Sequence, residues 1–157
     1  MIPKFFKGIT HLSDARFAAA QGFEYMGLNL DPQNGGISLS DAQEILGWCS
    51  GPLLVGDFGN APEAAVRDGV DLLQLDVAMG NHLPKGMDAF TREGNYWVSP
   101  EGLKMLVYSG TSNDFANWLE ENQPDGIVFE SLQEEKVGLR DFNDLVEILD
   151  IMEGSSR

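Results

Sequence analysis

Short apolar runs alternate with segments of helical periodicity along most of the chain. The apolar runs carry hydrophobic residues on both faces, which is typical of parallel strands covered by helices. These runs predict seven strands, at residues 5–9, 25–30, 52–59, 71–78, 87–93, 103–109 and 126–131. Apolar residues at helical spacing predict helical segments at 13–23, 38–49, 60–69, 112–123 and 138–152. This order with short connections indicates a parallel α/β fold.

Polar residues at the expected helix starts support these boundaries. Ser13 and Ser40 precede the apolar faces of the first two helices and are predicted to be N-caps, whose side chains accept a backbone N–H. Asn60 is the corresponding cap of the third helix, with Pro62 in its first turn. The rhythm weakens between residues 79 and 102, where turn residues are frequent and no helix is predicted.

Composition narrows the class of protein and its partners. The chain has 157 residues, 43% of them hydrophobic, and no linker, so we expect a single globular domain over residues 1–157. The net charge of −15, from 25 acidic and 10 basic residues, disfavours nucleic acid and membrane surfaces as partners. Neither a signal peptide nor a transmembrane run is found, so a cytoplasmic protein is expected.

The single cysteine and the glycine-rich segment give no sign of a bound cofactor. Cys49 has no second cysteine to form a disulfide or a thiolate metal cluster, and we interpret it as a small buried hydrophobe. The segment NGG at 34–36 is not followed by the lysine of a P-loop and is interpreted as a tight turn. No cofactor is therefore expected.

Two architectures fit this order of elements, a doubly wound open sheet and a (β/α) barrel. A complete barrel of eight units needs roughly 200 residues or more. At 157 residues the chain is shorter than that. Length alone therefore favours the open sheet.

Five segments resemble the phosphoribosylanthranilate isomerase family, whose members are (β/α)8 barrels of the tryptophan pathway. KFFKGITHLSDARFAAAQGFEYMGLNL at 4–30 is similar to the opening strand, alanine-rich helix and second strand of that family. The others are VGDFGN at 55–60, LLQLDV at 72–77, FANW at 115–118, and GIVFESLQEE with the following GLRD at 126–141. The resemblance implies an α/β TIM-type parallel barrel, shortened to about seven strands. The helix after the fifth strand and the seventh β/α unit would be missing.

The same resemblance implies that the isomerase chemistry is lost. The family's general base is a cysteine where this chain has Lys7, and its general acid is an aspartate where this chain has Tyr108. The arginine of the loop after the second strand has no counterpart in residues 32–37. The glycine of the phosphate-binding loop is Leu132 here, and Glu130 brings a negative charge to the place of the phosphate.

A parallel barrel keeps its chemistry at the carboxyl ends of its strands, which form the mouth. The sequence therefore predicts a candidate site there. Its candidate catalytic residues are Lys7, Asp76 and Tyr108. Its candidate ligand-binding residues are Asp31, Asp57, Glu130 and Ser131, with Asn29 beside them.

Lys7 has three interpretations. We expect a structural ion pair with Asp76 or Glu130, because lysine is almost never fully buried without a partner. The second is a base or Schiff-base nucleophile, which the neighbouring acids oppose. The third is that the mouth binds a divalent cation through carboxylate oxygens, for which the spacing gives no support. The four acids in that case would be Asp31, Asp57, Asp76 and Glu130.

Three kinds of function follow. The replaced residues favour a protein without isomerase activity that acts in binding, with a small molecule at the mouth, or in a structural role. An enzyme is the alternative, through either the parent isomerisation or a new reaction centred on Lys7. A third hypothesis is an assembly module whose strand edges pair with a second copy to give a homodimer.

Overall fold

The computed structural model describes residues 2–131 and 142–155. Within them lie eight strands: β1 (Lys4–Ile9), β2 (Tyr25–Asn29), β3 (Leu53–Asp57), β4 (Val77–Met79), β5 (Thr91–Glu93), β6 (Tyr96–Val98), β7 (Lys104–Val107) and β8 (Gly126–Glu130). The helices are α1 (Leu12–Ala20), the 3-10 helix η1 (Pro32–Asn34), α2 (Leu39–Leu46), α3 (Glu63–Leu73), α4 (Ser112–Asn122) and α5 (Asn143–Ser155).

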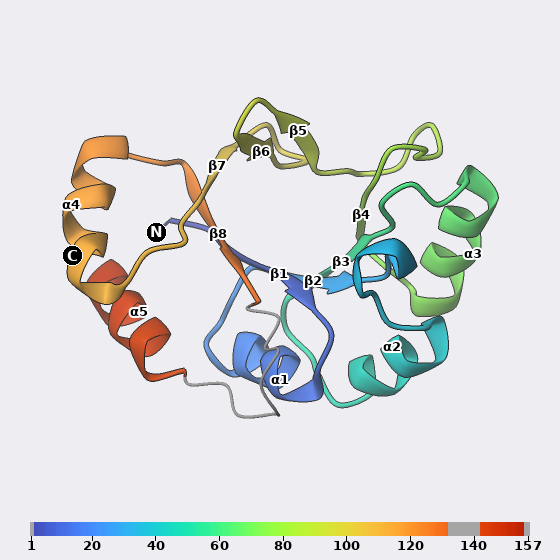
Figure 1. Cartoon of the computed structure of the whole chain (residues 1–157), viewed down its shortest axis with the longest axis horizontal. Helices are drawn as coiled ribbons and strands as arrows, with labels where there is room; N and C mark the ends of the chain where they lie inside the picture. Colours follow the sequence, from blue (N-terminus) through green and yellow to red (C-terminus); the bar gives the residue numbers. More distant parts are fainter. Residues whose placement is uncertain (1, 132–141, 156–157) are drawn as a thin grey trace.

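All eight strands belong to one strongly curved sheet (Figure 1). Their order across the sheet is β4-β3-β2-β1-β8-β7-β6-β5. The pairs from β4 round to β7 are parallel, whereas β6 pairs antiparallel with both β5 and β7. The expected parallel barrel is therefore confirmed as a nearly closed, mostly parallel sheet. It has eight strands rather than about seven, because residues 96–98 add the antiparallel strand β6.

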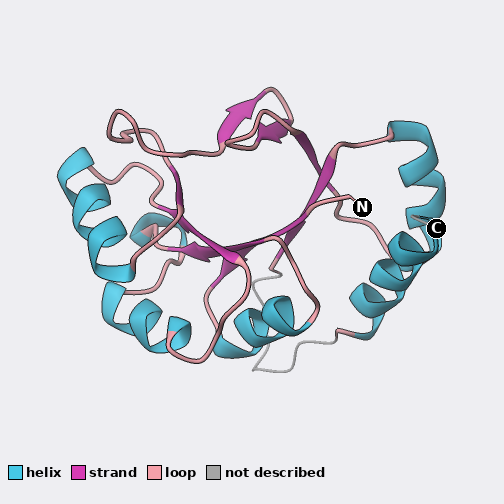
Figure 2. Cartoon of the chain, turned by 180° about the vertical axis from the view of Figure 1, so that it is seen from behind, coloured by secondary structure: helices cyan, strands magenta, loops and turns pink. Residues whose placement is uncertain are grey.

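The two edges of the sheet meet just before β5. Ala78 of β4 forms a parallel bridge with Ala89. The Ala78 amide donates to the Asp88 carbonyl at 3.0 Å, and the Phe90 amide donates to the Ala78 carbonyl at 3.1 Å. Figure 2 shows the resulting ring of strands from behind. These bonds pair backbone groups that an open sheet would leave at its edge.

The ring separates two hydrophobic cores. Phe5 points into the barrel, where its ring stacks on Phe90 at 4.6 Å between ring centroids. Phe6 points the other way, 5.4 Å from the ring of Phe23 in the layer between strands and helices. Side chains alternate across a strand, so neighbouring residues fill different cores. Alternation along β1 therefore accounts for the inward position of Phe5 and the outward position of Phe6.

Helices cover only part of the barrel wall. In Figure 1, α1, α2 and α3 lie outside β1–β4, and α4 and α5 lie outside β7 and β8. Residues 80–103, between β4 and β7, form loops and the β5–β6 hairpin, with no helix. The barrel wall between β4 and β7 therefore has no covering helix.

Three expected boundaries are wrong. The N-cap residue of α1 is His11 rather than Ser13, and that of α2 is Ser38, whose side chain accepts the Asp41 amide, rather than Ser40. The N-cap of α3 is Pro62 rather than Asn60. Helix α3 also continues to Leu73, which shortens the expected strand at 71–78 to β4. The apolar residues at the end of the helix are followed closely by those of the strand, so hydrophobic periodicity does not reveal the boundary between the two elements.

Candidate functional site

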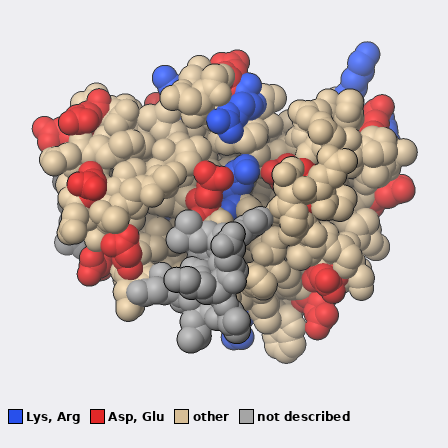
Figure 3. Space-filling view, in the orientation of Figure 1, with Lys and Arg blue, Asp and Glu red and all other residues tan. Residues whose placement is uncertain are grey.

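A cavity of about 300 Å³ lies at the carboxyl ends of β1, β2, β3 and β8. Its lining is mostly polar and consists of Lys7, Gly8, Asn29, Asp31, Asn34, Asp57, Glu130 and Ser131. Figure 3 shows this face hollowed near its centre, with a basic side chain in the hollow and acidic ones beside it. Five of the predicted residues, Lys7, Asp31, Asp57, Glu130 and Ser131, therefore line one cavity together with Asn29.

Lys7 lies in this mouth as expected, but its predicted partners are wrong. The Lys7 Nζ is 3.6 Å from Oδ2 of Asp57, and the two side chains are 16% and 24% exposed. Asp57 ends β3, two strands away from β1 in the sheet. Lys7 is in register with Glu130 on the adjacent strand, yet the long lysine side chain reaches across to Asp57 instead.

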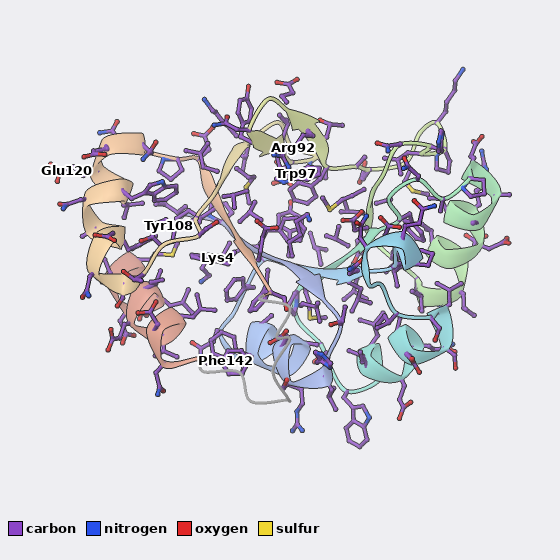
Figure 4. The ribbon with its side chains drawn as sticks, viewed as in Figure 1. Lys4, Arg92, Trp97, Tyr108, Glu120 and Phe142 are labelled. Carbon is purple, nitrogen blue, oxygen red and sulfur yellow. The ribbon has the colours of Figure 1, made fainter. Side chains whose placement is uncertain are left out.

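An aromatic ring and a second cation complete the surroundings of Lys7. The Lys7 Nζ lies 5.6 Å from the ring centroid of Trp97, and the guanidinium carbon of Arg92 lies 5.2 Å from it (Figure 4). Both are cation–π distances. Arg92 belongs to β5 and Trp97 to β6, neither of which entered the predicted site. The available signal was the Gly94-Asn95 pair between two short β-rich runs, a hairpin pattern.

Asn29 and Asp31 shape the rim rather than offer free groups. Each is 7% exposed. The Asp31 amide donates to Asn29 Oδ1 at 3.0 Å, and Asn29 Nδ2 donates to the Asn34 carbonyl at 3.0 Å. Asp31 Oδ1 accepts the Gln33 amide at 3.1 Å, and its Oδ2 accepts from Asn34 Nδ2. These bonds hold the loop after β2 in one conformation.

Asp76 lies at the opposite end of the barrel from the mouth. It precedes β4, and its Oδ2 accepts the amide of Leu54, near the start of β3, at 2.8 Å. The expected role at the mouth is wrong because β4 begins only at Val77, so its carboxyl end is Met79.

Tyr108 follows β7 but turns away from the mouth. Met105 and Val107 belong to the inner core, so alternation directs Tyr108 outward. Its ring is 4.9 Å from those of Phe115 and Trp118, and its hydroxyl donates to the Thr111 carbonyl. Burial, together with nearby Asp114 and Asp144, raises the pKa of the phenol. Figure 4 shows Tyr108 beside α4, well away from Trp97. Two of the three candidate catalytic residues are therefore outside the cavity.

The end of β8 connects the mouth to α1. The Ser131 amide donates to the Lys7 carbonyl at 2.7 Å, and its hydroxyl donates to Asp14 Oδ2 at 2.6 Å. Asp14 is 1% exposed and did not enter the predicted site. Glu130 is exposed. Leu132, which takes the place of the phosphate-loop glycine in the resemblance, lies outside the described residues.

Few polar groups of the cavity remain available to a ligand. The carboxylate of Asp31 is held by its loop, and Ser131 binds Asp14. Asp57 Oδ1 accepts the Gly59 amide at 3.1 Å, which leaves its Oδ2 to Lys7. The charged groups that face the cavity are therefore the Lys7 ammonium, Asp57 Oδ2 and the Glu130 carboxylate. In the part of the chain that the structure describes, no three His, Cys, Asp or Glu residues are grouped closely enough to hold a metal ion.

The fold is that of solved phosphoribosylanthranilate isomerases. One, in complex with reduced 1-(o-carboxyphenylamino)-1-deoxyribulose 5-phosphate, is 16% identical, with a TM-score of 0.76 over 98% of this chain and 100% of that one. The enzyme from Thermus thermophilus is 19% identical, with a TM-score of 0.75 over 99% and 100% of the two chains. A structure described as monomers of the dimeric Thermotoga maritima enzyme is 17% identical, with a TM-score of 0.74 over 98% and 100%.

At the level of sequence, neither a protein-family model nor a curated protein matches this chain. Among the described residues, no helix is long and apolar enough to cross a membrane.

Proposed function

We propose that this chain keeps the barrel of the phosphoribosylanthranilate isomerases without their isomerisation, and that its mouth binds a small molecule. The observation that carries the proposal is the position of Lys7. Its amine lies at the end of β1, within the cavity, beside the carboxylate of Asp57 and the ring of Trp97. The resemblance puts the family's general base at this residue.

The groups around the mouth are unsuited to that reaction. General acid–base catalysis needs a base and an acid within reach of the same substrate. The Lys7 amine is already paired with the carboxylate of Asp57. The Tyr108 hydroxyl is bonded to Thr111 outside the cavity. Glu130 would repel a phosphate by about 1 kcal/mol at ~4 Å in water, and by more where water is excluded.

The same groups suit binding. An ammonium and a carboxylate close together offer a donor and an acceptor to one polar ligand, and they lie in a cavity of about 300 Å³. Ligand sites combine a concave surface with a few polar groups that fix orientation. A homodimer is a further part of the proposal, supported by the dimeric Thermotoga maritima enzyme of the same fold.

An isomerase assay tests the loss of activity. Purified protein is incubated with phosphoribosylanthranilate, and the disappearance of substrate fluorescence is followed beside an active isomerase as positive control. We expect no turnover above buffer and no rescue of a tryptophan auxotroph that lacks the isomerase. Turnover that disappears in Lys7→Ala would contradict the proposal and favour catalysis centred on Lys7.

A ligand screen tests binding at the mouth. Thermal unfolding is measured with a panel of small polar metabolites, for the wild type and for Lys7→Met. A mouth ligand should raise the Tm of the wild type and have little effect on Lys7→Met. Lys104→Met, which removes an exposed lysine that lies over Tyr96 in the β6–β7 wall, is the matched control. A hit that stabilises Lys7→Met equally well binds elsewhere and would count against the mouth.

A further inference from the structure

A second cavity, of about 250 Å³, lies in the groove where the start of α1 faces α2. It shares no lining residue with the mouth and is independent of the function proposed for it. Its lining combines four apolar side chains (Leu12, Ile37, Ile45 and Trp48), two acids (Asp41 and Glu44), and the polar pair Thr10 and His11. We call it the α1–α2 groove.

Trp48 differs from the other two tryptophans. It is 68% exposed, the largest exposure among the exposed large hydrophobic residues of the described chain. Trp97 has Lys7 and Arg92 over its ring, and Trp118 packs against Tyr108. Among the described residues, no cation–π pair and no pair of aromatic rings involves the Trp48 indole. Keeping an indole in water gives no stability to the monomer, and tryptophan is enriched where partners bind.

The α2 side of the groove comes from a long stretch of the chain that has acidic residues but no Lys or Arg. No Lys or Arg occurs between Arg16 and Arg67, a stretch that contains all of β2, α2 and β3. Asp41 and Glu44 are exposed, and within the described residues neither takes part in an ion pair. They are three residues apart on α2, so they lie on the same face of the helix.

Two basic residues lie at or near the groove: His11 lines it, and Arg16 lies close by. Burial raises the pKa of the Cys49 thiol and Arg16 lowers it, which places Arg16 of α1 near the Trp48 end. The end formed by Asp41 and Glu44 stays acidic.

We propose that the α1–α2 groove docks an arginine side chain from a basic segment of another protein. Three parts of the groove match three parts of arginine. Leu12, Ile37 and Ile45 offer an apolar wall to the methylene stem. The carboxylates of Asp41 and Glu44 suit a planar guanidinium, and the exposed indole suits its flat face. Lysine carries a more strongly hydrated charge and fits this combination less well.

Titration with a matched pair of peptides tests the inference. The probe is an acetylated, amidated peptide of sequence Gly-Leu-Arg-Arg-Leu-Gly, and its control carries citrulline, the neutral isostere, in place of both arginines. Binding is followed by calorimetry and by the fluorescence of Trp48. We expect binding of the arginine peptide that is about ten-fold tighter than that of the citrulline peptide and that weakens with added salt.

Variants locate the site. Trp48→Ala should weaken binding about ten-fold, and Asp41→Asn with Glu44→Gln by a similar factor. Arg16→Gln, which removes the nearby guanidinium, should tighten it. Glu120→Gln, on the exposed face of α4 (Figure 4), is the matched control and should change nothing.

Four outcomes of the binding titrations would overturn the inference. They are no binding, equal binding of the two peptides, insensitivity to Trp48→Ala, or an equal effect of Glu120→Gln. Sedimentation of the wild type and of Trp48→Ala supplies the remaining check. A wild-type dimer that Trp48→Ala dissociates would assign the groove to a second copy of this chain and overturn the proposed partner.

Discussion

Gly59→Ala should destabilise the protein by disrupting the rim of the mouth. Gly59 has φ of +56°, and a Cβ at this position would lie 2.1 Å from Oδ2 and 2.3 Å from Cγ of Asp31. The left-handed backbone costs alanine roughly 1–2 kcal/mol. The Asp31 carboxylate must also move, losing bonds from the Gln33 amide and Asn34 Nδ2, at about 1 kcal/mol each. We expect a total loss of about 3–4 kcal/mol in the free energy of unfolding.

Gly94→Ala is the matched control for the backbone cost. Gly94 has φ of +58°, and none of the described atoms lies within 4 Å of its built Cβ. Gly94→Ala should therefore lower the free energy of unfolding only by the cost of backbone strain, roughly 1–2 kcal/mol. Urea denaturation of the two variants should show a difference of about 2 kcal/mol. At 2–4 °C per kcal/mol for a chain of this size, the Tm of Gly59→Ala should be roughly 4–8 °C lower than that of Gly94→Ala.

Asp31→Ala separates the contact from other effects of the substitution. In that background the Cβ of residue 59 no longer meets a carboxylate, so Gly59→Ala should cost little more than Gly94→Ala. In the double-mutant cycle of Gly59→Ala and Asp31→Ala, we expect the two losses in the free energy of unfolding to be non-additive by about 2 kcal/mol. That difference measures the clash between the Cβ of residue 59 and the Asp31 carboxylate. If Gly59→Ala and Gly94→Ala agree within about 0.5 kcal/mol in the wild-type background, the close approach of Asp31 to Gly59 is refuted.

Two further predictions concern stability. Lys7→Met should change the free energy of unfolding by less than about 1 kcal/mol, because the pair is partly exposed and the Asp57 carboxylate left behind keeps solvent access and the Gly59 amide. A loss above about 2 kcal/mol in urea would contradict this. Burial and the hydrogen bond to Glu101 raise the pKa of Tyr25, so wild-type stability should fall once pH exceeds ~10, where the unfolded phenol ionises first. Tyr25→Phe should fall less steeply, and equal slopes would contradict the assignment.

Local pattern determined much of this protein. The alternation of apolar runs and helical spacing predicted the β/α order. The alternation of side chains along β1 accounts for Phe5 inside the barrel and Phe6 under the helices. It also put Lys7 at the mouth. These properties repeat every two or every 3.6 residues along a chain, so neighbouring residues are sufficient to reveal them. Alternation along β7 also indicates that Tyr108 points outward. The prediction placed it at the mouth instead, because the resemblance aligns it with the family's general acid.

Tertiary structure decided which side chains meet. Lys7 pairs with Asp57 because β1 and β3 curve around the same mouth, and nothing in either strand alone specifies that distance. Asp76 lies at the other end because α3 extends to Leu73 and delays β4, a boundary that an unbroken apolar run conceals. The β5–β6 hairpin brings Arg92 and Trp97 to Lys7 from almost ninety residues away in the sequence. Contacts across a barrel depend on strand register and closure, and both are properties of the whole sheet.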